Sequence, residues 1–320
     1  MATGMTELKS RLNPLFIERL MQQFDVHTID RIINGFSANR LPIIRINTLK
    51  TDTHAVMRYL KEMNVLFERI PFLNDALIIR NRKEKFFEDL DIYKNGSMYF
   101  QGISSQLPAL FLAPAAGEKI LDMTAAPGSK TAQMGIMMKN EGEIFANEID
   151  LIRFERLKYN LDKQGIKIAK TNLGDGTKLG EQFPKYFDKV LLDAPCSAEG
   201  RISLTEQKSH KFWSEKNITQ NVKIQKKLLL SAVQTLKSGG MMVYSTCTLA
   251  PEENEAMVDF ALKTFPNELR VEKIDLDFKY KLPILKSFGG ILFDNRVQNT
   301  IKAMPSEISE GFFVAKFRKV

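Results

Sequence analysis

The chain contains two cysteines, Cys196 and Cys247, and each follows a segment that is typical of a buried strand. They lie in Asp193-Ala194-Pro195-Cys196-Ser197 and in Ser245-Thr246-Cys247-Thr248. A thiolate can add to carbon 6 of a cytosine and turn carbon 5 into an enamine carbon that attacks a methyl sulfonium. Free cysteines are also common core residues, so burial by chance is the alternative interpretation.

Two charged residues could support such a thiol. A cation such as Lys130, or a helix N-terminus, promotes the ionisation of a nearby thiol. Asp193 could hold the ring N3 and the exocyclic amine of the base, which stabilises the charge that develops as the thiolate adds. After methyl transfer the proton on carbon 5 must leave and the thiolate must be expelled, so a general base or a second thiol is useful. We therefore predict that Cys247, Cys196, Asp193 and Lys130 form one catalytic group.

A turn of small residues precedes the first helix of the second half of the chain. Its sequence is Thr124-Ala125-Ala126-Pro127-Gly128-Ser129-Lys130. Such a turn lets backbone N–H groups and a helix N-terminus approach a ligand, although a plain strand-to-helix connection explains it equally well. The chain has neither a Gly-x-x-x-x-Gly-Lys-Ser/Thr phosphate loop nor a strand-linked Gly-x-Gly-x-x-Gly, which disfavours a nucleoside triphosphate or NAD.

Carboxylates follow the next two predicted strands. Glu148 lies about 20 residues past the turn, where a carboxylate accepts hydrogen bonds from a ribose diol in nucleoside-binding sheets. Asp150 is explained as well by the dipole at a helix N-terminus. Asp175 could contact an adenine amino group, but Gly174-Asp175-Gly176 also makes a good turn by itself.

Strands and helices alternate beyond residue 117, which predicts a parallel sheet covered on both faces. The predicted strands are residues 119–123, 143–147, 167–171, 187–193 and 241–245. Helices are predicted from Gly128, from Asp150, over 218–236 and from Glu252, and residues 311–317 are a strand that could close the sheet. Ligands of such sheets bind beyond the carboxyl ends of the strands, where both cysteines fall.

The first third of the chain has a different pattern. Apolar residues recur at helical spacing over residues 8–24 and again to about residue 33. Strands at 43–46 and 76–79 with a helix over 52–63 then complete a small α+β module. A junction with Pro and Gly at residues 113–117 predicts two domains, 1–113 and 114–320.

Composition narrows the class of protein. The formal net charge of +8 favours a polyanionic partner, although many soluble proteins are mildly basic without one. No apolar run approaches the ~18 residues of a membrane span and the N-terminus lacks a signal-peptide pattern, so we expect a cytoplasmic monomer that binds no membrane. Because the chain has only two cysteines, we predict free thiols and no disulfide. Because it has neither a Cys-x-x-Cys motif nor a histidine cluster, we predict no metal site.

From about residue 43 to its end, the chain resembles the RsmB/NSUN-type RNA (cytosine-5) methyltransferases. The resemblance rests on several motifs in order, which are far less frequent by chance than any one of them. They are Arg45-Ile46-Asn47-Thr48-Leu49, Tyr99-Phe100-Gln101 with Ser104-Ser105, Ala125-Ala126-Pro127-Gly128-Ser129-Lys130-Thr131, Asn147-Glu148, Arg156-Leu157 with Asn160, Asp193-Ala194-Pro195-Cys196-Ser197, Ser245-Thr246-Cys247-Thr248 with Pro251-Glu252-Glu253-Asn254-Glu255, and Gly311-Phe312-Phe313.

The resemblance implies an α/β fold with a Rossmann-like S-adenosylmethionine-dependent methyltransferase domain, a mostly parallel seven-stranded sheet and a smaller N-terminal α+β RNA-binding module. It implies that Cys247 is the nucleophile and that Cys196 helps to release the methylated RNA. DNA cytosine methyltransferases attack with their Pro-Cys thiol instead, so local chemistry alone leaves this choice open. The cofactor contacts of the family carry over to residues 124–130, Glu148, Asp175 and Asp193.

Two departures from the family pattern occur. Thr124 stands where the family usually has Cys, at a contact that is largely backbone. Ala198-Glu199-Gly200 replaces a more usual Ser-Gly-Glu-Gly, and we assign no role to Glu199 from the sequence.

The expected substrate is RNA, either tRNA or rRNA, with tRNA slightly preferred. A flexible RNA loop suits the chemistry because the base must be unstacked before its carbon 6 meets a thiolate. We expect the N-terminal module to grip the RNA backbone, although the basic run at 80–85 is also typical of a solvated face. The candidate residues are Arg40, Arg45, Arg80, Arg82, Lys83 and Lys85.

Two rival classes are consistent with parts of the sequence. A methyltransferase of proteins or small molecules would need the cofactor site but neither cysteine. A non-catalytic RNA-binding or ribosome-assembly factor would keep the basic surface without needing both thiols and Asp193.

Overall fold

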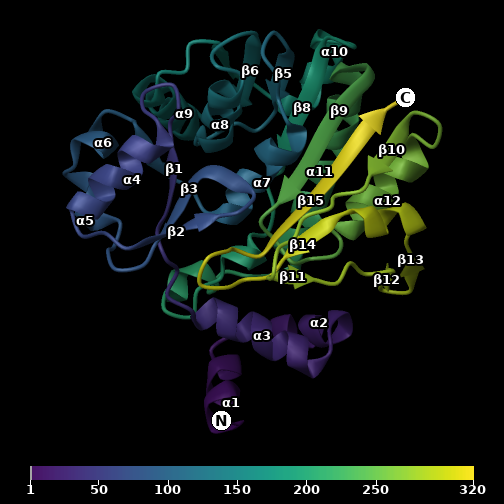
Figure 1. The fold of residues 1–320 in the computed structure, drawn as a ribbon. Coiled ribbons are helices and arrows are strands. Elements are labelled where there is room, and N and C mark those ends of the chain that lie inside the picture. Colours follow the sequence, from purple (N-terminus) through teal and green to yellow (C-terminus); the bar gives the residue numbers. More distant parts are fainter. Residues whose placement is uncertain (1) are drawn as a thin grey trace.

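Nine strands form one large sheet in the second half of the chain (Figure 1). This computed structural model describes residues 2–320, with side chains from Met5 onward. The sheet order is β11-β14-β15-β9-β8-β5-β6-β7, and β10 pairs with β15 off this path. The five strands of the parallel part are β5 (Lys119–Asp122), β6 (Glu143–Glu148), β7 (Ala169–Leu173), β8 (Phe187–Asp193) and β9 (Leu236–Thr246).

These five strands confirm the predicted parallel sheet, with two differences in their bounds. The fifth strand was predicted at 241–245 but runs from Leu236 to Thr246, because Leu236 already pairs with Phe187 of β8 before an irregularity in the register. The third strand was predicted at 167–171 but runs from Ala169 to Leu173. The reason is local: Gly165 ends the preceding helix in a left-handed conformation, and the Lys167 N–H donates to the Asn140 side chain instead of to a strand.

The remaining strands of the sheet are antiparallel. They are β10 (Leu269–Glu272), β11 (Lys281–Leu282), β14 (Ile301–Ala303) and β15 (Phe312–Lys319). Strand β15 lies between β9 and β14 and was predicted, whereas the others have two to four residues and are too short to show alternation. The predicted sheet of seven strands is therefore extended to nine, and β12 (Ser287–Phe288) and β13 (Ile291–Leu292) form a separate hairpin.

Helices cover both faces of the sheet, as predicted for alternating strands and helices. One face packs against α11 (Glu215–Thr235) and α12 (Glu255–Thr264), whose leucines and methionines join the largest core cluster. The other face packs against α7 (Ile103–Leu112) and α8 (Ser129–Met137). The other helices of this half are α9 (Leu151–Gln164), α10 (Leu179–Gln182), η1 (Gly176–Lys178), η2 (Glu199–Arg201), η3 (Gln207–Ser209) and η4 (Asn295–Asn299).

A smaller four-stranded antiparallel sheet forms the lobe at the left of Figure 1. Its order is β2-β3-β1-β4, and it has a core of its own centred on Ile44, Leu60 and Phe87. The lobe comprises β1 (Ile43–Ile46), α4 (Thr53–Glu62), β2 (Phe67–Ile70), β3 (Leu73–Ile79), α5 (Lys85–Glu88), α6 (Asp91–Lys94) and β4 (Met98–Phe100). The predicted α+β module is present, with β2 and β4 in addition to the two predicted strands.

Three helices precede this lobe: α1 (Ala2–Ser10), α2 (Pro14–Gln23) and α3 (Val26–Ser37). The prediction of one helix over residues 8–24 is wrong, because Asn13 caps a new helix whose first residue is Pro14. The apolar faces of α2 and α3 pack against Ile202 and Leu249 of the large domain. These helices therefore lie against the loops after β8 and β9, at the bottom of Figure 1.

Within residues 2–320, none of the helices combines the length and apolar character that crossing a bilayer requires.

Candidate active site

A cavity of about 520 Å³ opens at the carboxyl ends of the parallel strands. Its walls come from the turn after β5, the end of β6, the loop after β7 and the loops after β8 and β9. Of the predicted site residues, the cavity is lined by Thr124, Ala126, Pro127, Ser129, Lys130, Glu148, Asp175, Asp193, Cys196 and Cys247. Ala125 and Gly128 shape the same turn without lining the cavity, so the predicted residues are gathered around one site.

The two cysteines meet across neighbouring strands. In the parallel pair of β8 and β9, Asp193 lies opposite Ser245, so the loops that follow start side by side. The Sγ atoms of Cys196 and Cys247 are 3.4 Å apart and partly buried. The hydrogen bond with Cys247, with burial and the nearby charge, raises the pKa of Cys196 well above its usual range. Cys196 is thereby held as a protonated thiol beside the other sulfur.

Lys130 and Asp193 form a partly buried ion pair at the cavity wall. The Lys130 Nζ atom is 2.7 Å from Asp193 Oδ2 and donates a hydrogen bond of 3.1 Å to Ser105 Oγ. Burial opposes the ammonium form, but the charge and hydrogen bond of Asp193 outweigh it and raise the pKa of Lys130. The other oxygen of Asp193 accepts a hydrogen bond of 2.7 Å from Ser245 Oγ, so the carboxylate is fixed by one residue of α8 and one of β9.

The turn after β5 is shaped by backbone contacts. The Ala125 N–H donates to the Asn147 carbonyl at 2.8 Å, and Gly128 precedes helix α8 with a φ of 101°. A side chain is disfavoured there, because a Cβ atom on Gly128 would lie 3.0 Å from a methyl group of Leu157. Thr124, where the family usually has Cys, donates through Oγ1 to the Asp193 carbonyl at 2.9 Å and so joins the turn to β8.

Glu148 has the geometry expected of a ribose ligand. Its Oε1 atom accepts from the backbone N–H groups of Ile149 and Asp150, at 2.9 and 3.0 Å. Its Oε2 atom is buried and accepts no hydrogen bond, with Arg153 Nη1 at 3.6 Å. A buried carboxylate oxygen without a donor fits a ligand hydroxyl that would donate to it. Asp150 instead caps α9 by accepting from the Arg153 N–H, which supports its helix-terminus interpretation.

Asp175 forms the turn that was considered for it, and it also lines the cavity. Its Oδ1 atom accepts from the backbone N–H and the hydroxyl of Thr177, at 2.9 and 2.8 Å. These hydrogen bonds lower the pKa of Asp175 and fix the turn. The residue nevertheless lines the cavity next to Gly176 and Thr177, so it is available to a ligand as well.

Several residues at the site were not predicted to have a role in it. Tyr99, Ser105 and Phe312 line the cavity, and all three lie in motifs that the family resemblance had already included. Arg201 and Glu310 also line it, with Nε of Arg201 3.6 Å from Glu310 Oε1. No pattern in the sequence indicates these last two, because their proximity depends on the packing of η2 against the segment before β15.

A second cavity of about 780 Å³ adjoins the first and shares Ala198, Arg201 and Glu310 with it. Its lining includes three of the predicted RNA-binding residues, Arg40, Lys83 and Lys85. This groove lies between the loop after β8 and the small lobe. Its lining mixes the cations Arg40, Lys83, Lys85 and Arg201 with the carboxylates Glu84, Glu206 and Glu310.

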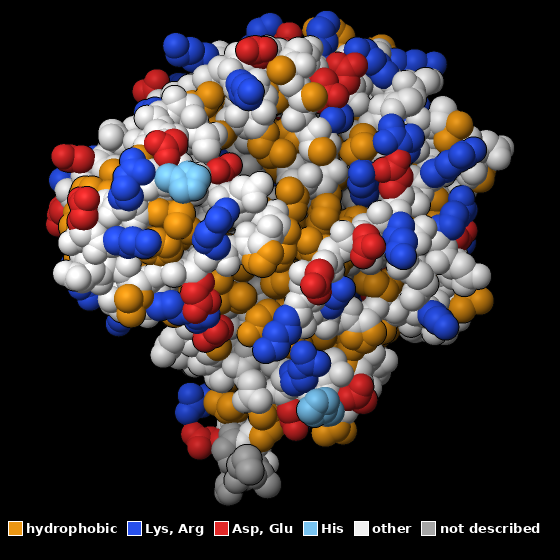
Figure 2. Space-filling view, viewed as in Figure 1, with side chains coloured by type: hydrophobic (Ala, Val, Ile, Leu, Met, Phe, Trp, Pro, Cys, Tyr) orange, Lys and Arg blue, Asp and Glu red, His pale blue; other side chains and the backbone are white. Residues whose placement is uncertain are grey.

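The other predicted RNA contacts are placed differently. Arg45 is buried and donates to Gln164 Oε1 at 2.6 Å, so it joins β1 of the small sheet to α9 of the large domain and cannot reach a phosphate. Arg80 pairs with Glu68 and Glu307. Figure 2 shows Lys and Arg interspersed with Asp and Glu over the visible face, not gathered in one strip, so net charge alone does not locate an RNA surface there. Among the described residues, no His, Cys, Asp and Glu side chains cluster as metal ligands would.

Comparison with known proteins identifies the family of this chain. The family model described as 16S rRNA methyltransferase RsmB/F matches residues 109–318. A tRNA (cytosine(49)-C(5))-methyltransferase of Pyrococcus abyssi is 39% identical over 282 residues, which cover 87% of this chain and 88% of the relative. A ribosomal RNA small subunit methyltransferase F of Vibrio vulnificus is 36% identical over 280 residues, but these cover only 57% of the relative.

Solved structures agree with the fold. A methyltransferase homologue from Pyrococcus horikoshii has a TM-score of 0.85 at 29% identity, over 99% of both chains. NSun6 from the same organism, solved with SFG, has a TM-score of 0.74 at 24% identity, over 90% of this chain and 93% of the other, and supports the fold alone. The predicted fold class, enzyme class and use of S-adenosylmethionine are thereby confirmed, and the chain belongs to the RsmB/F methyltransferase family.

Proposed function

We propose that this protein methylates carbon 5 of a cytosine in RNA through a covalent bond between Cys247 and carbon 6 of the base. One observation carries the proposal above all: the paired sulfurs of Cys196 and Cys247 lie in the same cavity as the Lys130–Asp193 ion pair and the nucleoside-type carboxylate Glu148. A methyltransferase of proteins or small molecules would not need that pair of thiols.

The residues divide the work as follows. The Cys247 thiolate adds to carbon 6, and the Asp193 carboxylate, fixed by Lys130 and Ser245, holds the amine edge of the ring as charge develops. After carbon 5 has accepted the methyl group, solvent water in the open cavity takes the proton from carbon 5 as the base. The electrons of that C–H bond re-form the double bond between carbons 5 and 6 and expel the Cys247 sulfur from carbon 6 as a thiolate. The raised pKa of Cys196 supports its assignment as the second thiol, which assists this release as a proton donor beside the leaving sulfur.

S-adenosylmethionine supplies the methyl group from its sulfonium when it is bound. Residues of the turn 124–130, with Glu148 and Asp175, would hold it. The buried Oε2 atom of Glu148, which accepts no hydrogen bond from the protein, fits a ribose hydroxyl, and the backbone of the turn fits the polar remainder.

We propose tRNA as the first substrate class to test and rRNA as the second. The relative named as a tRNA methyltransferase is matched over 88% of its length, whereas the Vibrio relative named for ribosomal RNA is matched over 57%. In this proposal residues 1–113 contribute RNA recognition, with Arg40, Lys83 and Lys85 along the second cavity.

A trapping experiment tests the covalent step. RNA that contains 5-fluorocytosine should form a stable adduct with the wild-type protein, because fluorine on carbon 5 cannot leave as a proton does. Cys247→Ala should form no adduct, whereas Cys196→Ala should form it and release ordinary methylated RNA slowly. An adduct that depended on Cys196 instead would reverse the assignment of the two thiols.

The substrate is tested by bisulfite sequencing of unmodified tRNA and rRNA after incubation with the protein and S-adenosylmethionine. Protected cytosines in tRNA alone would support the preference proposed above. Protection in rRNA alone would reject it, and protection in neither would reject RNA as the substrate.

A further inference from the structure

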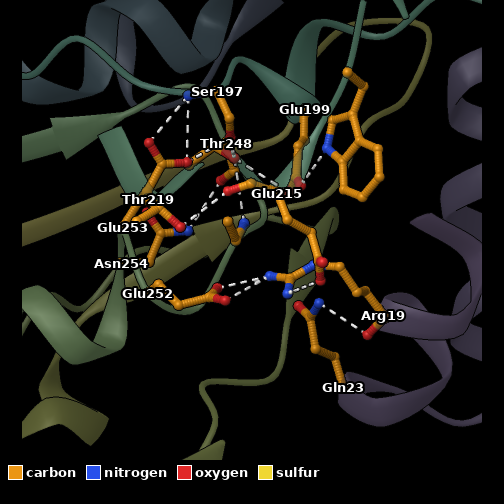
Figure 3. Close-up of polar contacts among 12 residues, drawn as sticks. Arg19, Gln23, Ser197, Glu199, Glu215, Thr219, Thr248, Glu252, Glu253 and Asn254 are labelled. Carbon is orange, nitrogen blue, oxygen red and sulfur yellow. Dashed lines mark hydrogen bonds and ion pairs between the residues drawn. The ribbon is translucent and has the colours of Figure 1, made fainter. Parts of the chain in front are cut away.

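Four polar side chains form a continuous chain of contacts (Figure 3), and three of them, Glu199, Thr248 and Glu253, are buried. Ser197 and Thr248 are the residues that follow the two cysteines, and their hydroxyl oxygens are 2.7 Å apart. Ser197 Oγ also forms a short hydrogen bond with Glu253 Oε2, and Thr248 Oγ1 lies 3.2 Å from Glu199 Oε2. We call the four residues Glu253, Ser197, Thr248 and Glu199 the polar tie.

The polar tie needs one proton more than its hydroxyl groups provide. It has three oxygen-to-oxygen contacts, but the two hydroxyl groups supply one proton each. All three contacts are hydrogen bonds only if Glu253 or Glu199 is protonated. Burial raises the pKa of Glu253 to about 7 and also raises that of Glu199, so a shared proton is retained near neutral pH.

Both ends of the polar tie are fixed by other elements. Glu253 Oε1 accepts from the Ser197 N–H and from Gln225 Nε2 on α11, each at 3.0 Å. Glu199 Oε1 accepts from Trp213 Nε1 at 2.8 Å. The loops after β8 and β9 are therefore joined to each other and to the surrounding helices through the residues next to the sulfurs.

We infer that the polar tie is a positioning device that holds the Cys196 and Cys247 loops in register, so that the second thiol stays within reach of the first during product release. This inference rests on the covalent mechanism proposed above. No atom of the polar tie bonds to either sulfur, so its members act through the loops. Forming the adduct needs one sulfur, whereas release needs both, and loss of the polar tie should therefore slow release selectively.

Three substitutions distinguish the loss of hydrogen bonds in the polar tie from a change in the shape of a side chain. Thr248→Val removes the central hydroxyl and keeps the side-chain shape, whereas Thr248→Ser keeps the hydroxyl. Glu253→Gln can donate from its amide to Ser197 Oγ while its oxygen still accepts from the Ser197 N–H, so it replaces the shared proton. Glu252→Gln is the matched control, because this neighbouring carboxylate bonds to Arg19 and not to the polar tie.

The experiment measures two rates in full-length protein: adduct formation on 5-fluorocytosine RNA, and release of ordinary RNA after a single methylation. For Thr248→Val we expect release to slow about tenfold or more, with covalent adduct accumulating, and adduct formation to change less than about twofold. Thr248→Ser, Glu253→Gln and Glu252→Gln should release at nearly the wild-type rate.

A pH series adds a second readout that a purely structural role would not change. The titratable groups facing Glu253 are Glu199, Cys196 and Tyr244, and α11 presents the neutral Gln225. As the pH rises through about 7, Glu253 loses the shared proton. The two hydroxyl groups then face two carboxylates, and one of the three contacts of the polar tie is no longer a hydrogen bond. The release rate of Glu253→Gln relative to wild type should therefore increase between about pH 6 and about pH 9.

The outcomes are distinct. If the Thr248→Val variant accumulates no more covalent adduct than the wild-type protein and releases methylated RNA at the same rate, the inference is wrong. It is also wrong if adduct formation and release slow to the same extent and thermal stability falls with them. A pH-independent ratio for Glu253→Gln would overturn the shared proton. If the wild-type protein itself forms no adduct through Cys247, the proposed function fails instead.

Discussion

At the cofactor end of the cavity the side chains are held by neighbours in sequence, whereas at the cysteine end they are held by distant residues. Glu148 is fixed by the next two backbone N–H groups, and Asp175 by Thr177. Ser197 and Thr248, by contrast, meet across 51 residues of sequence. The comparison teaches that the cofactor end is a local motif, while the cysteine end depends on the packing of the whole domain and can be disturbed from afar.

Lys130 gives the largest expected effect, because it belongs to the cofactor turn by sequence and to the cysteine end by its ion pair. Lys130→Met leaves the Asp193 carboxylate without its cation, and we expect kcat to fall about 10²- to 10³-fold. Affinity for S-adenosylmethionine, measured by calorimetry, should change little. Lys158→Met, on the exposed face of α9, is the control. If Lys130→Met weakened only the binding of S-adenosylmethionine, Lys130 would belong to the cofactor end of the cavity and not to the cysteine end.

Gly200 tests the dependence of the cysteine end on packing. Its N–H donates to the Cys247 carbonyl at 3.0 Å, and a Cβ atom would lie 1.9 Å from the Gly311 carbonyl oxygen. We expect Gly200→Ala to lower the free energy of unfolding by about 1–3 kcal/mol in urea titrations. Gly102→Ala meets no atom within 4 Å and should leave stability nearly unchanged. Equal stability of the two variants would show that the loop moves freely.

Glu148 tests the local end. Glu148→Gln keeps one oxygen for the backbone and removes the charge that a ribose hydroxyl would meet. We expect S-adenosylmethionine to bind about tenfold more weakly, with adduct formation at saturating cofactor preserved. Glu155→Gln, an exposed carboxylate on α9, is the matched control. A large loss of adduct formation at saturation would mean that the two ends are not separable.

Ala198 gives the smallest effect. It stands where the family pattern has Gly, and it adopts a left-handed conformation with a φ of 58°. Ala198→Gly should relieve strain of about 1 kcal/mol, partly offset by the greater freedom of the unfolded chain. A small rise in melting temperature with unchanged kcat is the expected result. A fall in stability would indicate that the Ala198 methyl group makes a packing contact worth more than the strain.

The same contrast explains what the sequence could predict. The strands β5, β6, β8 and β9 each have a short apolar run followed by polar residues, so their carboxyl ends were placed to within one residue and both cysteines fall just beyond a strand. The short strands β10, β11 and β14 have too few residues for a periodic pattern. Asn13 followed by Pro14 does signal a helix start, but the continuous apolar spacing across it concealed the break.

Within the site, the role of a residue could be predicted when its contacts lie close to it in the sequence, and could not when they lie far away. The turn 124–130 and Glu148 were predicted because strand-end position alone indicates them. Arg45 was assigned to RNA on its charge, yet it is buried against Gln164, which only the packing of the small lobe against α9 decides. Glu199 and Glu253 carry no local signal, since their role depends on which hydroxyl groups the fold brings beside them.

The position of β15 bears on how this protein is made. Strand β15 is inserted between β9 and β14, although it is the last strand along the sequence. While the ribosome still holds residues 312–319, the edge of β9 that precedes Cys247 is unpaired and β14 has no route into the sheet. We therefore expect the thiol site to be completed only after this segment has emerged, and a nascent chain arrested before it to lack methyltransferase activity.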